Sequence, residues 1–375
     1  MIYLDNAATT GKKPPGVIKA VNNALLTLSA NPGRSGHRPS LAASASVYSA
    51  REKAAKLFGA SGPENVVFTY NCTHSINTVI KGILKPGDHV VTSSLEHNAV
   101  MRPLYKTGAE PDIAEVSLTD DNITLNEFEK KIKPSTRLVI CTGASNVLGR
   151  TLPVAQIGAL CRSRGIPFAV DAAQTAGVMT IDMKKMNIDY LCIAPHKGLY
   201  APMGIGVLIC EKYIENTLTE GGTGTNSAEM TQPDSLPERL ESGTVAVPAI
   251  AGMSAGIDYV RSIGTDKIYR HELNLISELY KRLSSLKNVI LYTENPARGG
   301  FAPVLSFNVK GVPSGEIAAY LSEKGIAVRG GLHCAPSAHR QIGTLEVGTV
   351  RASVSAFNTL SDINALYTAV AAFKN

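Results

Sequence analysis

The chain has 375 residues, of which 44% are hydrophobic and 18% charged, and its formal net charge is +6. This composition is typical of a folded globular protein and excludes a disordered chain. A length beyond ~250–300 residues predicts two domains. The mild positive charge suits an anionic ligand, but no dense run of lysine and arginine indicates a nucleic-acid surface.

Neither the N-terminus nor the cysteines indicate secretion or a membrane. Residues 1–6 lack a basic segment followed by an apolar one, and no run of about 18 apolar residues occurs. The six cysteines are widely spaced and form no CxxC pair, so we expect reduced thiols rather than a disulfide framework or a zinc cluster. We therefore expect a cytoplasmic protein with no membrane partner and no metal.

The first part of the chain is expected to form an arm, two helices and a basic loop between them. In chain order these are an extended arm over 1–13, a helix over 14–28, a loop over 31–39 and a helix over 40–59. The loop carries Arg34, His37 and Arg38, and such loops are usually only solvated surface. We nevertheless expect residues 31–38 to meet a ligand or a neighbouring subunit.

The strand predicted over 64–69 is followed by the polar turn Tyr70–Ser75 and by a helical pattern from Ile76. A strand, a polar turn and a helix start present free backbone N–H groups and the positive end of a helix dipole, which together can bind an anion. Capping of the helix by Thr73 or Ser75 explains the same residues, and on these residues alone it is the simpler interpretation.

From residue 86 on, strands and helices alternate. We expect strands over 89–92, 112–116, 138–141 and 166–171, with helices from 99, over 125–132 and over 153–164. Alternating βα units with continuous apolar strands predict an α/β fold whose mostly parallel sheet has helices on both faces. Ligands bind at the carboxyl ends of such strands, and Asn146, Asp171 and Gln174 all follow strand-like runs.

The last part of the chain is expected to form a smaller α+β C-terminal domain. Residues 214–247 have no clear period and suggest a functional loop or an interface. Beyond them we expect a helix over 266–286, strands over 289–292 and 304–309, a helix capped by Ser314, a strand over 326–329, a loop through Cys334, a strand over 349–354 and a final helix from Ser361. The predicted domains are residues 13–255, and residues 1–12 together with 256–375.

One lysine and one carboxylate suggest a cofactor. Lys197 lies in a turn, and Asp171 ends the apolar run Ile166–Val170. Together they fit pyridoxal phosphate, because a lysine can hold its aldehyde as a Schiff base while an aspartate pairs with its pyridinium nitrogen. A surface lysine and a helix-capping aspartate are the alternatives.

Eight short motifs occur in the order expected of the cysteine desulfurases: Tyr3–Thr9, Glu96–Asn98, Ser145–Gly149, Asp171–Gln174, His196–Lys197, Arg239–Thr244, His333–Ala335 and Arg351–Ser353. The chain resembles that branch of the class V aminotransferase family over nearly its whole length. The resemblance implies the PLP-dependent transferase fold of type I.

The resemblance also implies a set of residues that contact the cofactor. These are Thr73, His74, His97, Asn146, Asp171, Gln174, His196, Lys197 and Thr244. Within the set, Lys197 also moves the Cα proton of the substrate, Asp171 keeps the ring nitrogen protonated, and His97 stacks on the ring. Thr244 is implied to come from the partner subunit of a homodimer, with the 31–38 loop nearby.

The phosphate-binding part of this set departs from the family pattern. The family usually has serine where this chain has Ala194, so one hydroxyl contact to the phosphate is missing. We expect either weaker cofactor retention or a larger share of the binding for Ser75 or Thr244.

Cys334 decides which reaction the resemblance implies. Its thiolate would take sulfur from L-cysteine as a persulfide and release L-alanine. Gly330, Gly331 and Pro336 place Cys334 in a loop beside His333, which we expect to lower its pKa. The other cysteines are expected to be structural.

The substrate carboxylate would be bound by Arg351, with Arg329 and Asn146 as further substrate contacts. The short loop around Cys334 resembles the group II desulfurases and selenocysteine lyase-like proteins. A short loop has limited reach, so we expect a separate sulfur-acceptor protein to approach Cys334.

Three other functions stay open on the sequence. A selenocysteine lyase would use the same lysine chemistry on L-selenocysteine and would depend less on Cys334. A class V aminotransferase would accumulate pyridoxamine phosphate, and a sulfur-relay protein would bind the cofactor without turnover.

Overall fold

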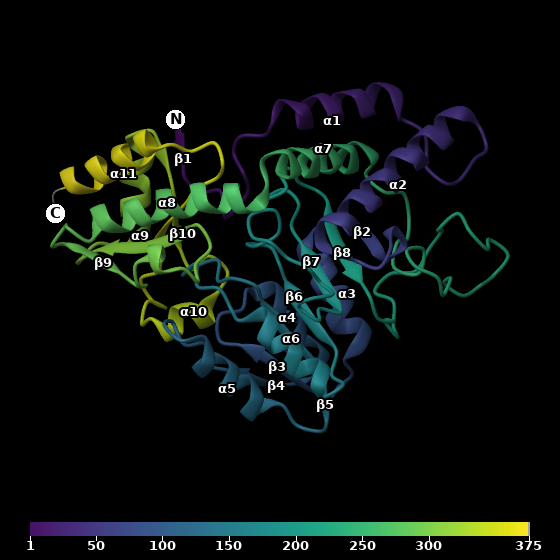
Figure 1. Ribbon diagram of the computed structural model, residues 1–375, viewed down its shortest axis with the longest axis horizontal. Coiled ribbons are helices and arrows are strands. Elements are labelled where there is room, and N and C mark those ends of the chain that lie inside the picture. Colours follow the sequence, from purple (N-terminus) through teal and green to yellow (C-terminus); the bar gives the residue numbers. More distant parts are fainter. Residues whose placement is uncertain (374–375) are drawn as a thin grey trace.

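The computed structural model describes residues 1–373 (Figure 1), and its strands form three β-sheets. The helices are α1 (Pro15–Thr27), α2 (Arg38–Phe58), α3 (Cys72–Ile83), α4 (Asn98–Thr107), α5 (Asp121–Lys131), α6 (Val154–Ser163), α7 (Val247–Ile263), α8 (Thr265–Leu283), α9 (Ser314–Glu323), α10 (Pro336–Gln341) and α11 (Leu360–Ala372). The strands are β1 (Ile2–Tyr3), β2 (Val66–Thr69), β3 (His89–Ser93), β4 (Glu110–Ala114), β5 (Thr136–Thr142), β6 (Phe168–Asp171), β7 (Tyr190–Ile193), β8 (Gly206–Cys210), β9 (Val289–Leu291), β10 (Val304–Val309), β11 (Ile326–Ala327), β12 (Arg329–Gly331) and β13 (Thr349–Ser353).

The largest sheet has seven strands in the order β2-β8-β7-β6-β5-β3-β4. Neighbouring strands from β7 to β4 are parallel, and β8 is antiparallel to both strands beside it. This arrangement confirms the predicted mostly parallel sheet. Because β2 and β7 are both antiparallel to β8, they run in the same direction. The carboxyl ends of β2, β3, β5, β6 and β7 therefore lie along one edge.

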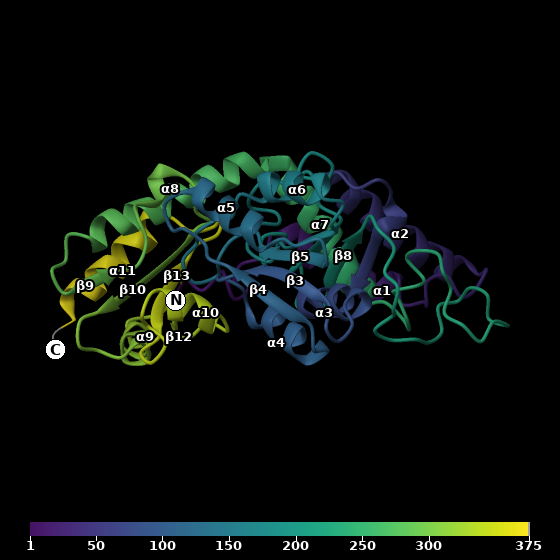
Figure 2. The ribbon, with the colours of Figure 1, turned by 90° about the horizontal axis from the view of Figure 1, so that it is seen from below.

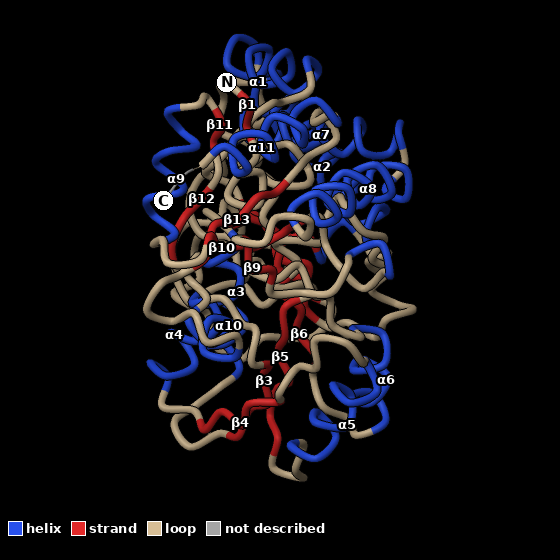
Figure 3. The backbone as a smooth tube through the Cα atoms, turned by 90° about the vertical axis from the view of Figure 1, so that its left-hand side faces the viewer, coloured by secondary structure: helices blue, strands red, loops and turns tan. Residues whose placement is uncertain are grey.

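Both faces of this sheet are buried by helices, as its continuous apolar strands require. Along β5, Leu138 and Ile140 belong to one core and Val139 and Cys141 to the other, because successive side chains of a strand alternate. Helices α3 and α4 cover the first face, while α2, α5, α6 and α7 cover the second. Figures 2 and 3 show the two helical layers on opposite sides of the sheet, which confirms the predicted fold class.

A four-stranded antiparallel sheet, β12-β13-β10-β9, has a core of its own. Phe307 of β10 shares this core with Leu279 of α8, Leu321 of α9 and Leu366 of α11. Leu4 joins the same core, and β1 pairs in parallel with β11. The N-terminal arm therefore lies with the C-terminal elements. The domain boundaries stay a prediction, and the one at 255/256 lies inside α7.

Several local expectations are wrong. Strands β7 and β8 and helix α7 were not predicted, and α10 lies where a loop was expected. Helix α3 begins at Cys72 and is capped by Asn71, whose side-chain oxygen accepts the His74 N–H at 2.9 Å, so neither Thr73 nor Ser75 is the cap. Ser314 is the first residue of α9, and its hydroxyl donates to the Val347 carbonyl at 2.7 Å, so it does not cap this helix as expected.

Within residues 1–373, no helix combines the length and apolar character needed to cross a membrane.

Candidate active site

The carboxyl edge of the large sheet brings most of the predicted cofactor residues together. Thr73 follows β2, His97 follows β3, Asn146 follows β5, Asp171 ends β6 and Lys197 follows β7. All five line one cavity, which Cys72, Gln174, Ala194 and His196 also line. The edge is shared because parallel strands place their carboxyl ends side by side, which is where such sheets bind ligands.

Lys197 and Asp171 bring an amine and a carboxylate to the same cavity. Burial lowers the pKa of Lys197, while the negative charge of Asp171 opposes this shift. Asp171 Oδ1 accepts the Ala173 N–H at 2.9 Å and the Cys72 thiol at 3.6 Å. In the described part of the chain, neither Asp171 Oδ2 nor the Lys197 amine has a hydrogen-bond partner. Both groups are thus available to a ligand in the cavity.

The first turn of α3 forms another part of the cavity wall. The backbone N–H groups of Cys72 and Thr73 have no acceptor inside the helix, because they belong to its first turn. Free donors at a helix N-terminus suit a phosphate. A reactive amine, an unpaired carboxylate oxygen and an anion site therefore fit pyridoxal phosphate, with Lys197, Asp171 and the start of α3 as the residues that would hold it.

Three residues expected to take part in cofactor binding, His74, Ser75 and Thr244, do not line this cavity. The His74 ring stacks on Tyr70, with the ring centroids 5.2 Å apart. Ser75 is fully buried, and its hydroxyl lies 2.8 Å from the Thr69 hydroxyl, so it does not replace the group missing at Ala194. Thr244 is exposed and accepts a hydrogen bond from Asn31 Nδ2 at 3.2 Å.

His97 lies at the start of α4, where its Nδ1 accepts the Ala99 N–H at 3.0 Å. Burial lowers the pKa of His97, although the negative charge of Asp171 opposes this shift. A neutral ring that accepts a hydrogen bond at Nδ1 carries its proton on Nε2.

The residue before His97, Glu96, was assigned no role from the sequence. Burial raises its pKa to about 8, and its Oε1 accepts the Thr142 N–H at 2.9 Å. This buried carboxyl ties the end of β3 to the end of β5.

Arg351 on β13 is buried, with 1% of its surface exposed. Its Nη2 pairs with Asp5 Oδ1 at 2.6 Å, and its Nη1 donates to the Asn146 carbonyl at 3.1 Å. Arg329 lies directly opposite on β12 and forms no ion pair with the residues described. The ion pair between Asp5 and Arg351 was not predicted, because the only signal in the sequence was that Asp5 lies in the Tyr3–Thr9 motif.

Cys334 is the one exposed thiol among the six cysteines. Cys334 and His333 have φ angles of 58° and 51°, in the left-handed region that residues other than glycine rarely adopt. His333 is buried, and its Nε2 donates to the Thr349 carbonyl at 3.0 Å. Burial holds the pKa of His333 well below its usual value, so the ring is uncharged. The expected effect of His333 on the neighbouring thiol stays a prediction.

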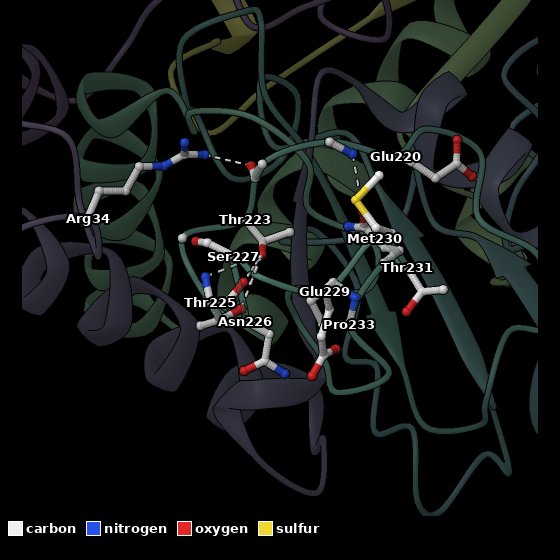
Figure 4. Close-up of a pocket in the computed structure, with 14 residues that line it drawn as sticks. Arg34, Glu220, Thr223, Thr225, Asn226, Ser227, Glu229, Met230, Thr231 and Pro233 are labelled. Carbon is white, nitrogen blue, oxygen red and sulfur yellow. Dashed lines mark hydrogen bonds between the residues drawn. The ribbon is translucent and has the colours of Figure 1, made fainter.

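A different cavity lies between Arg34 and the loop 220–233 (Figure 4). Arg34 Nη2 donates to the carbonyls of Gly222 at 2.6 Å and Gly243 at 3.1 Å. The 31–38 loop thus contacts a distant part of its own chain. Its contact with a neighbouring subunit stays a prediction.

Comparison with known proteins gives the family. The sequence matches the class-V aminotransferase family over residues 2–366. It is 34% identical over 377 residues to a probable cysteine desulfurase of Pyrococcus abyssi, covering 97% of this chain and 92% of that protein. A probable cysteine desulfurase of Methanothermobacter thermautotrophicus is 32% identical over 375 residues, with coverages of 97% and 92%.

Solved structures agree with this assignment and with the predicted type I fold. The apo cysteine desulfurase of Thermococcus onnurineus matches with a TM-score of 0.91 at 33% identity, covering 99% of this chain and 94% of that one. A cysteine desulfurase of Escherichia coli gives a TM-score of 0.86 at 29% identity, with coverages of 98% and 93%. The chain therefore belongs to the class V aminotransferase family, in its cysteine desulfurase branch, whose members depend on pyridoxal phosphate.

Proposed function

We propose that this chain is a cysteine desulfurase that converts L-cysteine to L-alanine and holds the sulfur as a persulfide on Cys334. One observation carries this proposal, namely that the lysine and the carboxylate lie close to the exposed thiol. Lys197, Asp171 and Asn146 line the same cavity. The Asn146 side chain donates a hydrogen bond to the carbonyl of His333, the residue before the exposed Cys334. Pyridoxal phosphate, when bound, supplies an electron sink for charge that develops on the substrate's Cα.

Arginine and lysine side chains near the cavity bind and deprotonate the substrate in this proposal. Arg351, with Arg329 beside it, binds the substrate carboxylate, since a guanidinium matches a carboxylate in charge and shape. Lys197 Nζ takes the Cα proton, because its lowered pKa leaves more of the amine unprotonated. His97 stacks on the cofactor as an uncharged ring. Asp5 keeps Arg351 oriented while no substrate is bound.

Sulfur transfer then uses the Cys334 thiolate. It attacks the side-chain sulfur of the substrate, so an S–S bond forms while the Cβ–S bond breaks. The electron pair of the broken bond stays with the carbon, whose protonation gives L-alanine, and the thiol hydrogen stays with the transferred sulfur. We propose that a sulfur-acceptor protein removes the outer sulfur, because Cys334 is exposed and hydrogen bonds to Asn98 and Asn146 hold its segment in place.

Release of alanine from L-cysteine by the loaded protein tests this function. We expect stoichiometric alanine in a first turnover and continued release when a thiol reductant removes the persulfide. Absence of alanine would rule out the desulfurase. L-Selenocysteine is the second substrate to measure, because equal selenocysteine turnover with and without Cys334 would favour a selenocysteine lyase. Accumulation of pyridoxamine phosphate would favour an aminotransferase.

We also infer a homodimer in which Thr244 and the 31–38 loop lie near the cofactor of the partner subunit. The inference is supported by Thr244 being exposed and not among the residues that line the cavity of its own chain. A cytoplasmic location also stays part of the proposal, since all six cysteines are free thiols.

Mixed dimers separate a shared site from a site made by one chain. We expect a dimer of a Lys197→Ala chain with a Thr244→Ala chain to retain one cofactor tightly through dialysis, because one of its sites keeps both residues. Placing both substitutions on one chain beside a wild-type partner should weaken that retention by ~10- to 100-fold, the loss expected for one hydrogen bond to a charged group. Tighter cofactor retention in the second mixed dimer than in the first would mean that Thr244 contacts the cofactor of its own chain.

A further inference from the structure

The segment that carries Cys334 is tied to the cofactor cavity by two backbone carbonyls. The His333 carbonyl accepts a hydrogen bond from Asn146 Nδ2 at 2.7 Å, and the Cys334 carbonyl accepts the Asn98 N–H at 2.7 Å. Asn146 follows β5 and lines the cavity, while Asn98 begins α4 next to His97. The walls of the cavity thus hold the segment in place.

Asn146 lines the cofactor cavity and also contacts the segment that carries Cys334. The residue is 8% exposed, and its backbone carbonyl accepts a hydrogen bond from Arg351 Nη1. A side-chain amide offers two N–H groups and one oxygen, and only one of these N–H groups is used by His333. The described residues donate no hydrogen bond to Asn146 Oδ1. The side chain therefore keeps hydrogen-bonding capacity for a molecule in the cavity while it holds the Cys334 segment.

The backbone at this point needs such support. His333 and Cys334 are consecutive residues in the left-handed region, and neither is a glycine. Backbones in sparsely populated regions persist only when the surrounding structure holds them there. Besides the two carbonyl contacts, the His333 imidazole donates to Thr349 at 3.0 Å, and the Ala335 N–H donates to the Leu332 carbonyl at 3.0 Å. Loss of one tether should therefore let the segment relax.

We propose that Asn146 is a positioning residue that couples the cofactor cavity to Cys334. A cofactor that orders the Asn146 side chain also fixes the His333 carbonyl, and this in turn fixes the direction of the Cys334 thiol. The proposal rests on the proposed use of Cys334 as the sulfur carrier. It assigns to Asn146 a mechanical role in addition to its expected contact with the cofactor or substrate.

Hydrogen–deuterium exchange of the peptide spanning residues 330–336 tests the coupling without any substrate. In the wild-type chain we expect loading with pyridoxal phosphate to slow exchange of this peptide by at least about fivefold, the factor that corresponds to one hydrogen bond. In Asn146→Asp, which keeps the shape but loses the N–H donor, we expect cofactor-free exchange to be at least about fivefold faster than in the cofactor-free wild type. Loading should then have no effect on this peptide.

His333→Ala is the matched control. It removes the bond from the imidazole to Thr349 but keeps the backbone carbonyl that Asn146 holds. Its exchange should be faster than in the wild type and should still slow on loading. A peptide from α5, Asp121–Lys131, should exchange at the wild-type rate in every variant, which excludes general loosening.

Three results would overturn the proposal. The first is that loading with pyridoxal phosphate leaves the exchange rate of peptide 330–336 in the wild type unchanged. The second is that this peptide exchanges at the wild-type rate in cofactor-free Asn146→Asp. The third is that loading still slows its exchange in that variant. If Asn146→Asp does not fold, Asn146→Ser replaces it. Because exchange is measured without turnover, an enzyme that lacked desulfurase activity could still show the coupling, so the two proposals fail separately.

Discussion

The Lys197→Ala variant should release alanine from L-cysteine at least about 10²- to 10⁴-fold more slowly than the wild type, because it loses both the covalent link to the cofactor and the amine that moves the Cα proton. Borohydride reduction of the loaded wild-type protein should fix the cofactor to the peptide that contains Lys197. The same treatment of the variant should leave the cofactor free to dialyse away.

Lys13 provides the matched control for this experiment. Its amine donates to Thr10 Oγ1 at 2.6 Å and to the His196 carbonyl at 3.0 Å, and burial lowers its pKa to about 8. It is thus a second amine of lowered pKa close to Lys197, but it does not line the cavity. Lys13→Ala should keep the covalent cofactor. A label on Lys13, or full activity in Lys197→Ala, would show that the site has been assigned to the wrong lysine.

Cys334→Ala should lower alanine release from L-cysteine by at least about 10³-fold, because no nucleophile remains to take the sulfur. Addition of L-cysteine should still change the absorbance of the loaded variant, since the lysine and arginine side chains are untouched. Mass spectrometry should find one extra sulfur on the Cys334 peptide of the wild type after a single turnover, and none on any peptide of the variant.

A buried thiol gives the comparison for this variant. Cys161 on α6 lies in the core of the large sheet, so Cys161→Ala should keep the wild-type rate and the extra sulfur on Cys334. Full cysteine turnover by Cys334→Ala would contradict the persulfide step. A variant that lost cysteine turnover but kept selenocysteine turnover would instead support the lyase alternative.

Much of the large sheet and its edge could be predicted from sequence because the signals are local. Strands buried on both faces are continuous apolar runs, and polar residues at their carboxyl ends must share an edge, which places Asn146, Asp171 and Gln174 together. Helix α7 could not be found in this way. It contains Gly252 and Gly256, which have low helix propensity. Tertiary packing explains both, because a Cβ at Gly256 would collide with the Leu199 carbonyl and one at Gly252 would lie 2.7 Å from Pro202 Cδ.

The missed features of the site depend on contacts between distant parts of the chain. Asn146 and His333 are 187 positions apart, and Asp5 and Arg351 are 346 positions apart. Spacing along the sequence carries no information about such pairs. The same limit applies to His333, whose position beside Cys334 suggests a charged neighbour, while its burial leaves the ring uncharged. Burial of a single side chain depends on the packed structure rather than on its neighbours in sequence.

The exposure of a single thiol has a consequence for oxidative damage. Peroxides and electrophiles react with accessible thiols, and oxidation beyond the sulfenic acid is largely irreversible. Because five of the six cysteines are buried, we expect such reagents to modify Cys334 first. With Cys334 in its proposed role, a molecule oxidised there would keep its fold and its cofactor but could no longer carry sulfur. Oxidative stress would therefore stop sulfur delivery before it unfolded the protein. A measurement of bound cofactor would not detect this loss of sulfur transfer.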